Sequence, residues 1–274
     1  MAIHSFLKAE RGDPDWQFSP EDYIGKEFKI IDASMVEIEE NDGDRVVLRQ
    51  NPTEKDLLAK HLRVNLQKNS TLDLMILNEV DENLQQVFLY DIHLKPGANL
   101  SLGMFVKDGK LNKHILQVFL EDGASFAGYG LITNAAGGDS EVITKIIHDG
   151  QESASSQLFM GLAGKESQTV FQSTVVAEPN AHASQIGIES SNMIIEEGGR
   201  CYAKPDIYLN AEYCKSSQGA EISSIGEEKL GYLESKGIPE DIARDMLISR
   251  FRNQVINLIQ QDNIRDEVKE LYVD

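Results

Sequence analysis

Residues 182–251 read HASQIGIESSNMIIEEGGRCYAKPDIYLNAEYCKSSQGAEISSIGEEKLGYLESKGIPEDIARDMLISRF, and the spacing of apolar residues changes within this stretch. Before Ile225 apolar and polar residues alternate, as around Ile186 and Ile188, which is typical of strands. From Gly226 onwards the apolar residues recur at helical spacing. The stretch therefore predicts short strands that are followed by helices.

The helical part contains signals for two helices. Gly226 suits the N-cap of the first helix, and Gly237 suits the left-handed residue after its end. Pro239 suits the first position of a second helix. One face of that helix carries an apolar stripe made of Leu247, Phe251, Val255 and Leu258. Such a face must be buried, either against the chain's own sheet, which periodicity alone favours, or against another protein.

Upstream, residues 62–225 predict one strand after another. The candidates are 71–77, 86–94, 100–106, 115–120, 126–133, 142–148, 157–162, 169–177, 183–189, 193–195, 206–209 and 220–225. Two further strands, 28–31 and 45–48, precede a short helix predicted from Asn51 to about Leu62. No long segment of helical period interrupts the strands from 62 to 225, which excludes a fold built from βαβ units.

An internal repeat indicates how these strands are arranged. Gly97, Gly123 and Gly150 each lie in a turn that precedes a strand, and they are 26 and 27 positions apart. One repeat is too short to bury its own apolar face, but stacked repeats form a continuous core. The spacing therefore favours a solenoid over the two competing all-β folds, a sandwich and a jelly roll.

Composition limits the class of protein. The chain has 274 residues and a formal net charge of −19, which argues against nucleic acid or an anionic membrane as the main partner. No run of about 18 apolar residues predicts a transmembrane helix. The first residues lack the apolar core of a secretory signal, so a reducing, cytoplasmic location is expected.

Motifs for catalysis are missing from the sequence. It contains no G-x-S-x-G, no H-E-x-x-H and no Walker A sequence, and no spacing singles out a pair of carboxylates for glycoside hydrolysis. Cys201 and Cys214 are its two cysteines, thirteen positions apart, whereas an iron–sulfur cluster held by one chain usually takes four thiolates. We therefore expect a protein without enzymatic activity that cannot ligate a cluster alone.

Four segments together resemble a known family. They are Lys204-Pro205, KSSQGAEISSI at 215–225, EEKLGYLESKGI at 227–238, and the helix from Ala243-Arg244 to Phe251. In this order they are similar to the SufB/SufD family of iron–sulfur cluster assembly scaffolds, and more to SufD. The resemblance is clearest over 182–262 and extends back to about residue 60. It describes a short variant without most of the N-terminal helical region of SufD.

The resemblance implies a fold and a division of the chain. The fold is a right-handed parallel β-helix with a C-terminal α-helical segment. Residues 1–61 form a mixed segment that caps the solenoid, 62–225 the β-helix core, and 226–274 the helical domain.

The resemblance also implies partners. The C-terminal helices of the family dock SufC, an ABC-type ATPase, and the residues expected to do so here are Leu230, Tyr232, Leu233, Met246, Leu247 and Phe251. A SufB-like subunit, or an identical one, pairs with the last strands at about 206–225 by β-augmentation. On this reading the chain is a scaffold subunit of the SufBCD type.

Residues expected at the cluster-assembly interface depart from the family pattern. Gln218 occupies the position of the SufD histidine, and Ser190 lies near that of a SufB cysteine. Cys214 and Cys201 are the candidate metal ligands that remain. We expect no tightly bound cofactor, and a cluster shared transiently with a partner subunit. Because an amide oxygen is a poor iron ligand beside imidazole or thiolate, a metal-free structural homodimer or interaction protein is the alternative.

Overall fold

The computed structural model describes residues 29–38, 44–50 and 58–272. Within these ranges it contains 14 strands and three helices. The strands are β1 (Lys29–Ile38), β2 (Asp44–Gln50), β3 (Leu58–Leu66), β4 (Thr71–Glu79), β5 (Gln85–Leu94), β6 (Asn99–Lys107), β7 (Leu111–Leu120), β8 (Ser125–Ala136), β9 (Asp139–His148), β10 (Ala154–Lys165), β11 (Gln168–Ala177), β12 (Gln185–Ile194), β13 (Arg200–Leu209) and β14 (Lys215–Ser224). The helices are α3 (Glu227–Ser235), α4 (Glu240–Ile256) and α5 (Asp262–Leu271).

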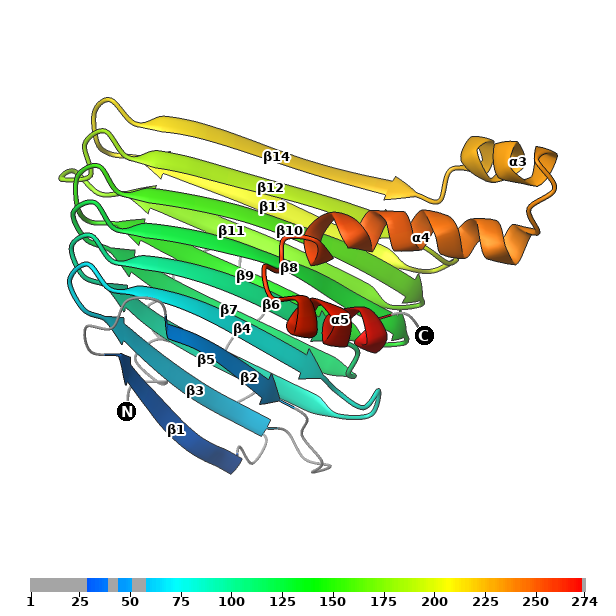
Figure 1. Ribbon diagram of the computed structural model, residues 1–274, viewed down its shortest axis with the longest axis horizontal. Helices are drawn as coiled ribbons and strands as arrows, with labels where there is room; N and C mark the ends of the chain where they lie inside the picture. The colour runs from blue at the N-terminus through cyan, green and yellow to red at the C-terminus, as the bar shows by residue number, and fades with distance from the viewer. Residues whose placement is uncertain (1–28, 39–43, 51–57, 273–274) are drawn as a thin grey trace.

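The strands form two sheets that alternate along the chain. Odd-numbered strands form sheet A in the order β1-β3-β5-β7-β9-β11-β13, and even-numbered strands form sheet B from β2 to β14. Neighbours within each sheet are parallel, because each strand pairs with the strand two further along the chain. Successive strands thus wind around a common interior (Figure 1). The predicted solenoid is confirmed, and the sandwich and jelly roll, which are antiparallel, are wrong.

The turns from sheet A to sheet B carry the repeat found in the sequence, with one change. Gly97 and Gly123 have positive φ angles of 72° and 64°, and the N–H of Gly123 bonds the carbonyl of Gln151 in the next turn at 2.9 Å. In that next turn the left-handed residue is Glu152, at φ 55°, rather than Gly150. Gly150 is needed for another reason, since a Cβ there would lie 2.1 Å from the backbone nitrogen of Asp122.

Inward side chains of both sheets fill the interior. Leucine, isoleucine, valine and phenylalanine from β3 to β12 form one continuous cluster. Phe159 of β10 stacks on Phe171 of β11, with ring centroids 4.6 Å apart. Gly128 and Gly130 of β8 leave room for that ring, because a Cβ on either would lie within 3.6 Å of Phe159. Apolar burial of this kind supplies most of the stability of the solenoid.

The sheets begin earlier than the predicted core boundary at residue 62. β1, β2 and β3 join the same two sheets as the later strands. The short helix predicted to end near Leu62 is wrong at least from residue 58, where β3 begins. Alternating burial of Leu62, Val64 and Leu66 explains why this segment is a strand. The part of the predicted cap that comprises residues 1–28 lies outside the described residues.

Three helices follow β14, where the sequence predicted a pair. α3 has Gly226 as its N-cap, and Gly237 takes the left-handed conformation at φ 83°, as predicted. Pro239 was predicted at the first helical position of the second helix, but it is the N-cap, and α4 begins one residue later at Glu240. α5 and the C-terminal half of α4 lie on the outer face of sheet B (Figure 1). Of the helices in the described part of the chain, none is both long and apolar enough to cross a membrane.

Candidate functional site: the last coil and the helical arm

The last coil leaves one end of the solenoid uncovered. β14 is hydrogen-bonded to β12 and β13 to β11, and each is the last strand of its sheet among the described residues. All ten residues of β14 are exposed. Two adjacent strands with free main-chain groups form a template for pairing with another chain.

Large apolar side chains gather at this end. They are Tyr202, Tyr208, Leu209, Tyr213 and Ile222, which are 36, 54, 45, 83 and 50% exposed. One coil earlier, Ala177 in register with Leu209 and Asn192 in register with Ile222 are 0 and 1% exposed, because a further coil covers them. Free strand edges together with exposed aromatic residues mark this end as an interaction surface.

The two cysteines lie at opposite ends of the last coil. Cys201 is the second residue of β13 and Cys214 directly precedes β14. The eight residue steps of β13 from Cys201 to Leu209 alone span about 26 Å. The structure therefore does not bring the two thiols together as ligands of one metal ion.

Each thiol also has a partner within the chain. Thr169 Oγ1 donates to Cys201 Sγ at 3.4 Å, and Cys214 Sγ donates to the carbonyl of Ala181 at 3.3 Å. Burial raises the pKa of the Cys201 thiol, which the bond from Thr169 opposes only in part. A raised pKa disfavours the thiolate, which is the form that binds metals.

Gln218 and Ser190 belong to neighbouring strands of sheet B. Gln218 lies midway along β14 opposite Ile188 of β12, and its side chain is exposed at the open end. Ser190 is buried and accepts a hydrogen bond from Asn192 Nδ2 at 3.0 Å. In the part of the chain that the structure describes, no three histidine, cysteine, aspartate or glutamate side chains are grouped as a metal site.

The predicted ATPase-docking residues divide into buried and exposed ones. Leu230 and Phe251 are 9 and 7% exposed and pack into the chain's own core. Leu233 and Leu247 are half-buried around Ala243, whereas Tyr232 and Met246 are 62 and 48% exposed.

Helices α3 and α4 together form the helical arm, and sequence reasoning missed one exposed apolar residue of it. Ile242 is 49% exposed and lies one turn before Met246 on α4. Their spacing of four residues, which places two side chains on the same face of a helix, was the signal available in the sequence. Ile242, Met246 and Tyr232 are the exposed large apolar side chains of α3 and α4, and we call them the arm patch.

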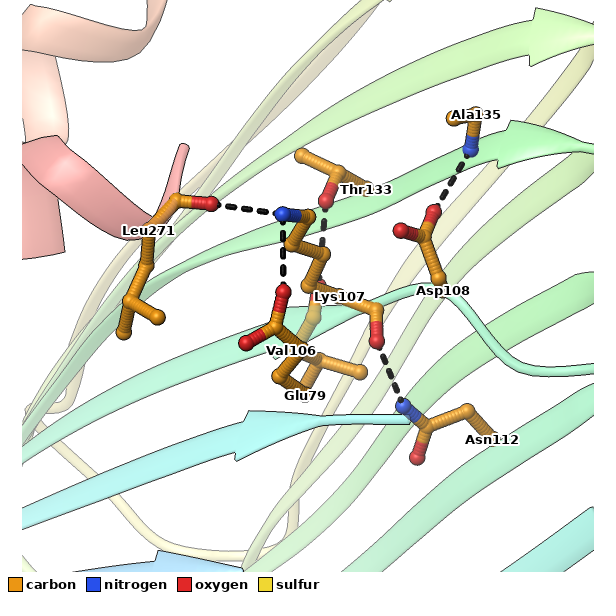
Figure 2. Close-up of polar contacts among 8 residues, drawn as sticks. All are labelled: Glu79, Val106, Lys107, Asp108, Asn112, Thr133, Ala135 and Leu271. Carbon is orange, nitrogen blue, oxygen red and sulfur yellow. Dashed lines mark hydrogen bonds and ion pairs between the residues drawn. The ribbon is translucent and has the colours of Figure 1, made fainter. Parts of the chain in front are cut away.

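A polar latch holds the other end of the helical segment on sheet B (Figure 2). Lys107 Nζ, at the end of β6, donates to Glu79 Oε1 at 2.8 Å and to the carbonyl of Leu271 at 2.7 Å. A positive charge at the C-terminus of α5 also complements the helix dipole. Tyr272, which follows α5, is buried with its ring 6.1 Å from that of Phe105. Helix α5 is thus held on sheet B, whereas the arm patch lies on α3 and the N-terminal half of α4.

Comparisons with known proteins identify relatives of this arrangement. Residues 24–251 match the family described as "SUF system FeS cluster assembly, SufBD core domain". An iron–sulfur cluster assembly SufBD family protein of Synechocystis is 25% identical over 162 residues, which cover 59% of this chain and 36% of that protein.

Two further relatives come from a plant and a bacterium. The chloroplastic protein ABCI7 of Arabidopsis thaliana is 29% identical over 60% of this chain and 34% of its own length. The iron–sulfur cluster assembly protein SufD of Escherichia coli is 23% identical over 42% of this chain and 27% of its own length. The matched segments thus span about a third or less of these relatives.

Proposed function

Because this chain belongs to the SufBD family, we propose that it is a non-catalytic scaffold subunit of an iron–sulfur cluster assembly complex. The observation that carries the proposal is the uncovered last coil, in which all ten residues of β14 are exposed. A soluble protein rarely leaves two such strands unpaired unless another chain covers them. The partner at this end is a SufB-like subunit or a second copy, joined by main-chain pairing.

The second partner is an ABC-type ATPase of the SufC kind, docked on the helical arm. The arm patch supports this assignment, because Tyr232, Ile242 and Met246 present apolar surface that the chain itself leaves open. Leu230 and Phe251 are buried and anchor α3 and α4 to the rest of the chain. Leu233 and Leu247 are half-buried, between these buried side chains and the exposed arm patch.

The cluster is cargo in this proposal and not a resident cofactor. The chain contributes surface at the joint between subunits, and the partner subunit contributes most of the ligands. Cys201 and Cys214 lie too far apart to ligate one iron together. We place the complex in the cytoplasm, where thiols stay reduced.

A metal-free structural homodimer is the second candidate function. Two observations favour it: the separation of the two cysteines, and the amide of Gln218 where the resemblance places an imidazole. Iron content after anaerobic reconstitution of the complex separates the candidates. Serine at both Cys201 and Cys214 abolishes iron binding if the thiols are ligands and leaves it unchanged if they are not.

Co-purification tests the scaffold role. The chain is co-expressed with a tagged SufC-type ATPase and should be retained with it. Tyr232→Glu combined with Met246→Glu should reduce retention at least tenfold, because two charges replace apolar contacts. Leu258→Glu is the matched control, since Leu258 is 40% exposed and lies beyond α4, outside the arm patch. Failure of the unmodified chain to co-purify would refute ATPase docking.

A further inference from the structure

The connection from α4 to α5 crosses the outer face of sheet B (Figure 1), and a cavity lies between the two. The volume of this cavity is about 360 Å³, which is within the range of pockets that hold small molecules. Strands β4, β6 and β8 line one side of it, and side chains between Leu258 and Ile264 line the other. The cavity is separate from the last coil and from the arm patch, and the scaffold role makes no use of it.

Gly103 shapes the floor of the cavity. This outward-facing residue of β6 lies between Met75 of β4 and Tyr129 of β8 in register. A Cβ on Gly103 would lie 2.5 Å from Met75 Sδ and 3.1 Å from Tyr129 Cζ. The missing side chain thus lets Met75 and Tyr129 close over β6, and the buried Ile264 of α5 completes an apolar floor.

Polar side chains around this floor lack hydrogen-bond partners in the part of the chain that the structure describes. They are Ser101 and Tyr129 of the sheet, and Gln261 and Asn263 at the start of α5. Burial and the charge of nearby Asp73 raise the pKa of Tyr129 to about 12, so its hydroxyl keeps its proton and remains a donor. Polar groups from two separate parts of the chain therefore converge on one space, as they do around a bound ligand.

The donors and acceptors around the cavity select the class of ligand. Asp73 is the one carboxylate among the described residues that line it, and these include no lysine or arginine, so an anionic or phosphorylated molecule would be repelled. An ammonium or guanidinium group would meet Asp73 but accepts no hydrogen bond, and it would leave the amide N–H groups and the Tyr129 hydroxyl unmatched. Hydroxyl groups both donate and accept, as the amides and hydroxyls of the cavity do.

We propose that this cavity binds a small neutral polyhydroxylated molecule of the size of a monosaccharide. The hydroxyls of such a ligand would donate to Asp73 and accept from Tyr129 and the amides, while its C–H groups pack on Met75 and Ile264. A ligand held in this way joins sheet B to the connection between α4 and α5. It therefore adds to the latch of Lys107 in holding α5 on the solenoid. The proposal depends neither on the scaffold role nor on ATPase docking.

Methyl NMR of the full chain with ¹³C-labelled methionine methyl groups tests the class of ligand. Met75 lines the cavity, and Met246, exposed on α4, is the internal reference. Glucose or myo-inositol should shift the Met75 resonance saturably, with half-saturation at about 1–10 mM, and leave Met246 unchanged. Glucose 6-phosphate and agmatine should shift neither. A response to the charged probes alone, an equal shift at Met246, or no shift up to about 100 mM polyol would overturn the proposal.

Removal of two hydroxyls tests the position of the site. Tyr129→Phe combined with Ser101→Ala should raise the half-saturating glucose concentration at least about tenfold, because two hydrogen bonds to the ligand are lost. The fold should persist, since neither hydroxyl bonds another group of the described chain. Tyr213→Phe combined with Ser217→Ala is the matched control, with both residues exposed at the last coil. Equal half-saturation in the two variants would place the ligand elsewhere and overturn the site.

Amide hydrogen exchange tests the consequence for the helical segment. Saturating myo-inositol should slow exchange in α5 of the unmodified chain and leave it unchanged in the chain with Tyr129→Phe and Ser101→Ala. The same slowing in both chains, or along the whole solenoid, would be the general effect of a polyol that is excluded from protein surfaces, and it would overturn the site. The ATPase takes no part in these measurements, so their failure leaves the proposed function standing.

Discussion

Acid should destabilise this protein through two buried histidines. His148 is fully buried, and its Nδ1 and Nε2 each lie 2.8 Å from a serine hydroxyl, of Ser153 and Ser155. Burial lowers the pKa of His148 to about 4. His114 lies 5.0 Å from the ring of Phe88, and burial lowers its pKa to about 3.

The direction in which the free energy of unfolding changes with pH follows from the linkage between protonation and folding. A histidine in the unfolded chain takes up a proton near pH 6.5, whereas the native chain stays neutral at these two sites until pH 4 or below. The unfolded state therefore binds more protons in this window, and the free energy of unfolding falls as the pH falls below 6.5. At pH 5 each histidine costs about 2 kcal/mol, and the two together cost about 4 kcal/mol.

His148→Gln isolates one of these contributions. The difference in unfolding free energy between the unmodified chain and this variant should shrink by about 2 kcal/mol from pH 7 to pH 5. Urea denaturation followed by far-UV circular dichroism, at one fixed protein concentration, measures it. His182→Gln is the matched control, since His182 is exposed, and it should keep the pH dependence of the unmodified chain. Equal differences at pH 7 and pH 5 for His148→Gln would refute the reasoning.

Further predictions concern the turns, the latch and the close approaches of neighbouring strands. Ala183 has a φ of 60°, so Ala183→Gly should raise the free energy of unfolding by about 0.5–1 kcal/mol, whereas Ala181→Gly, at a buried site without positive φ, should lower it. Lys107→Met should cost about 1–2 kcal/mol and speed amide exchange in α5, and unchanged exchange would contradict the latch. Gly130→Ala should cost about 3 kcal/mol or more in thermal or urea unfolding, because its Cβ would lie 2.0 Å from a backbone oxygen. Gly231→Ala, with no atom within 4 Å of the new Cβ, should instead stabilise α3 by about 0.5–1 kcal/mol.

The solenoid could be predicted because its turns repeat in the sequence. Gly97 and Gly123 both hold the left-handed turn position. Gly150 also lies in a turn before a strand, as predicted, but not at the left-handed position, because the register step from β8 to β10 is 29 residues where that from β6 to β8 is 26. The left-handed position there passes to Glu152, which sequence statistics do not favour.

The helical segment could be predicted in type but not in packing. Periodicity identified the apolar face of α4, yet it cannot tell whether the chain itself or a partner covers that face. Phe251 and Leu230 proved to be core, and Tyr232 and Met246 proved to be exposed. The missed helix α5 carries its own signal, with Ile264 and Val268 buried four residues apart.

The separation of the two cysteines depends on the placement of strands, which sequence spacing does not reveal. Cys201 and Cys214 are thirteen positions apart in the sequence, but β13 runs between them and places them at opposite ends of the last coil.

The interior also changes character towards the open end, which connects stability to pairing. In sheet B the inward positions in register run from Leu102 through Gly128 and Gln157 to Ile188 and Gln218. Apolar burial therefore weakens towards the last coil, and β14, exposed along its whole length, depends on its ladder with β12. A partner that adds a second ladder stabilises β14 where the solenoid itself contributes least. Assembly and ordering of this end are therefore expected to be coupled, as in other strands that are completed by a second chain.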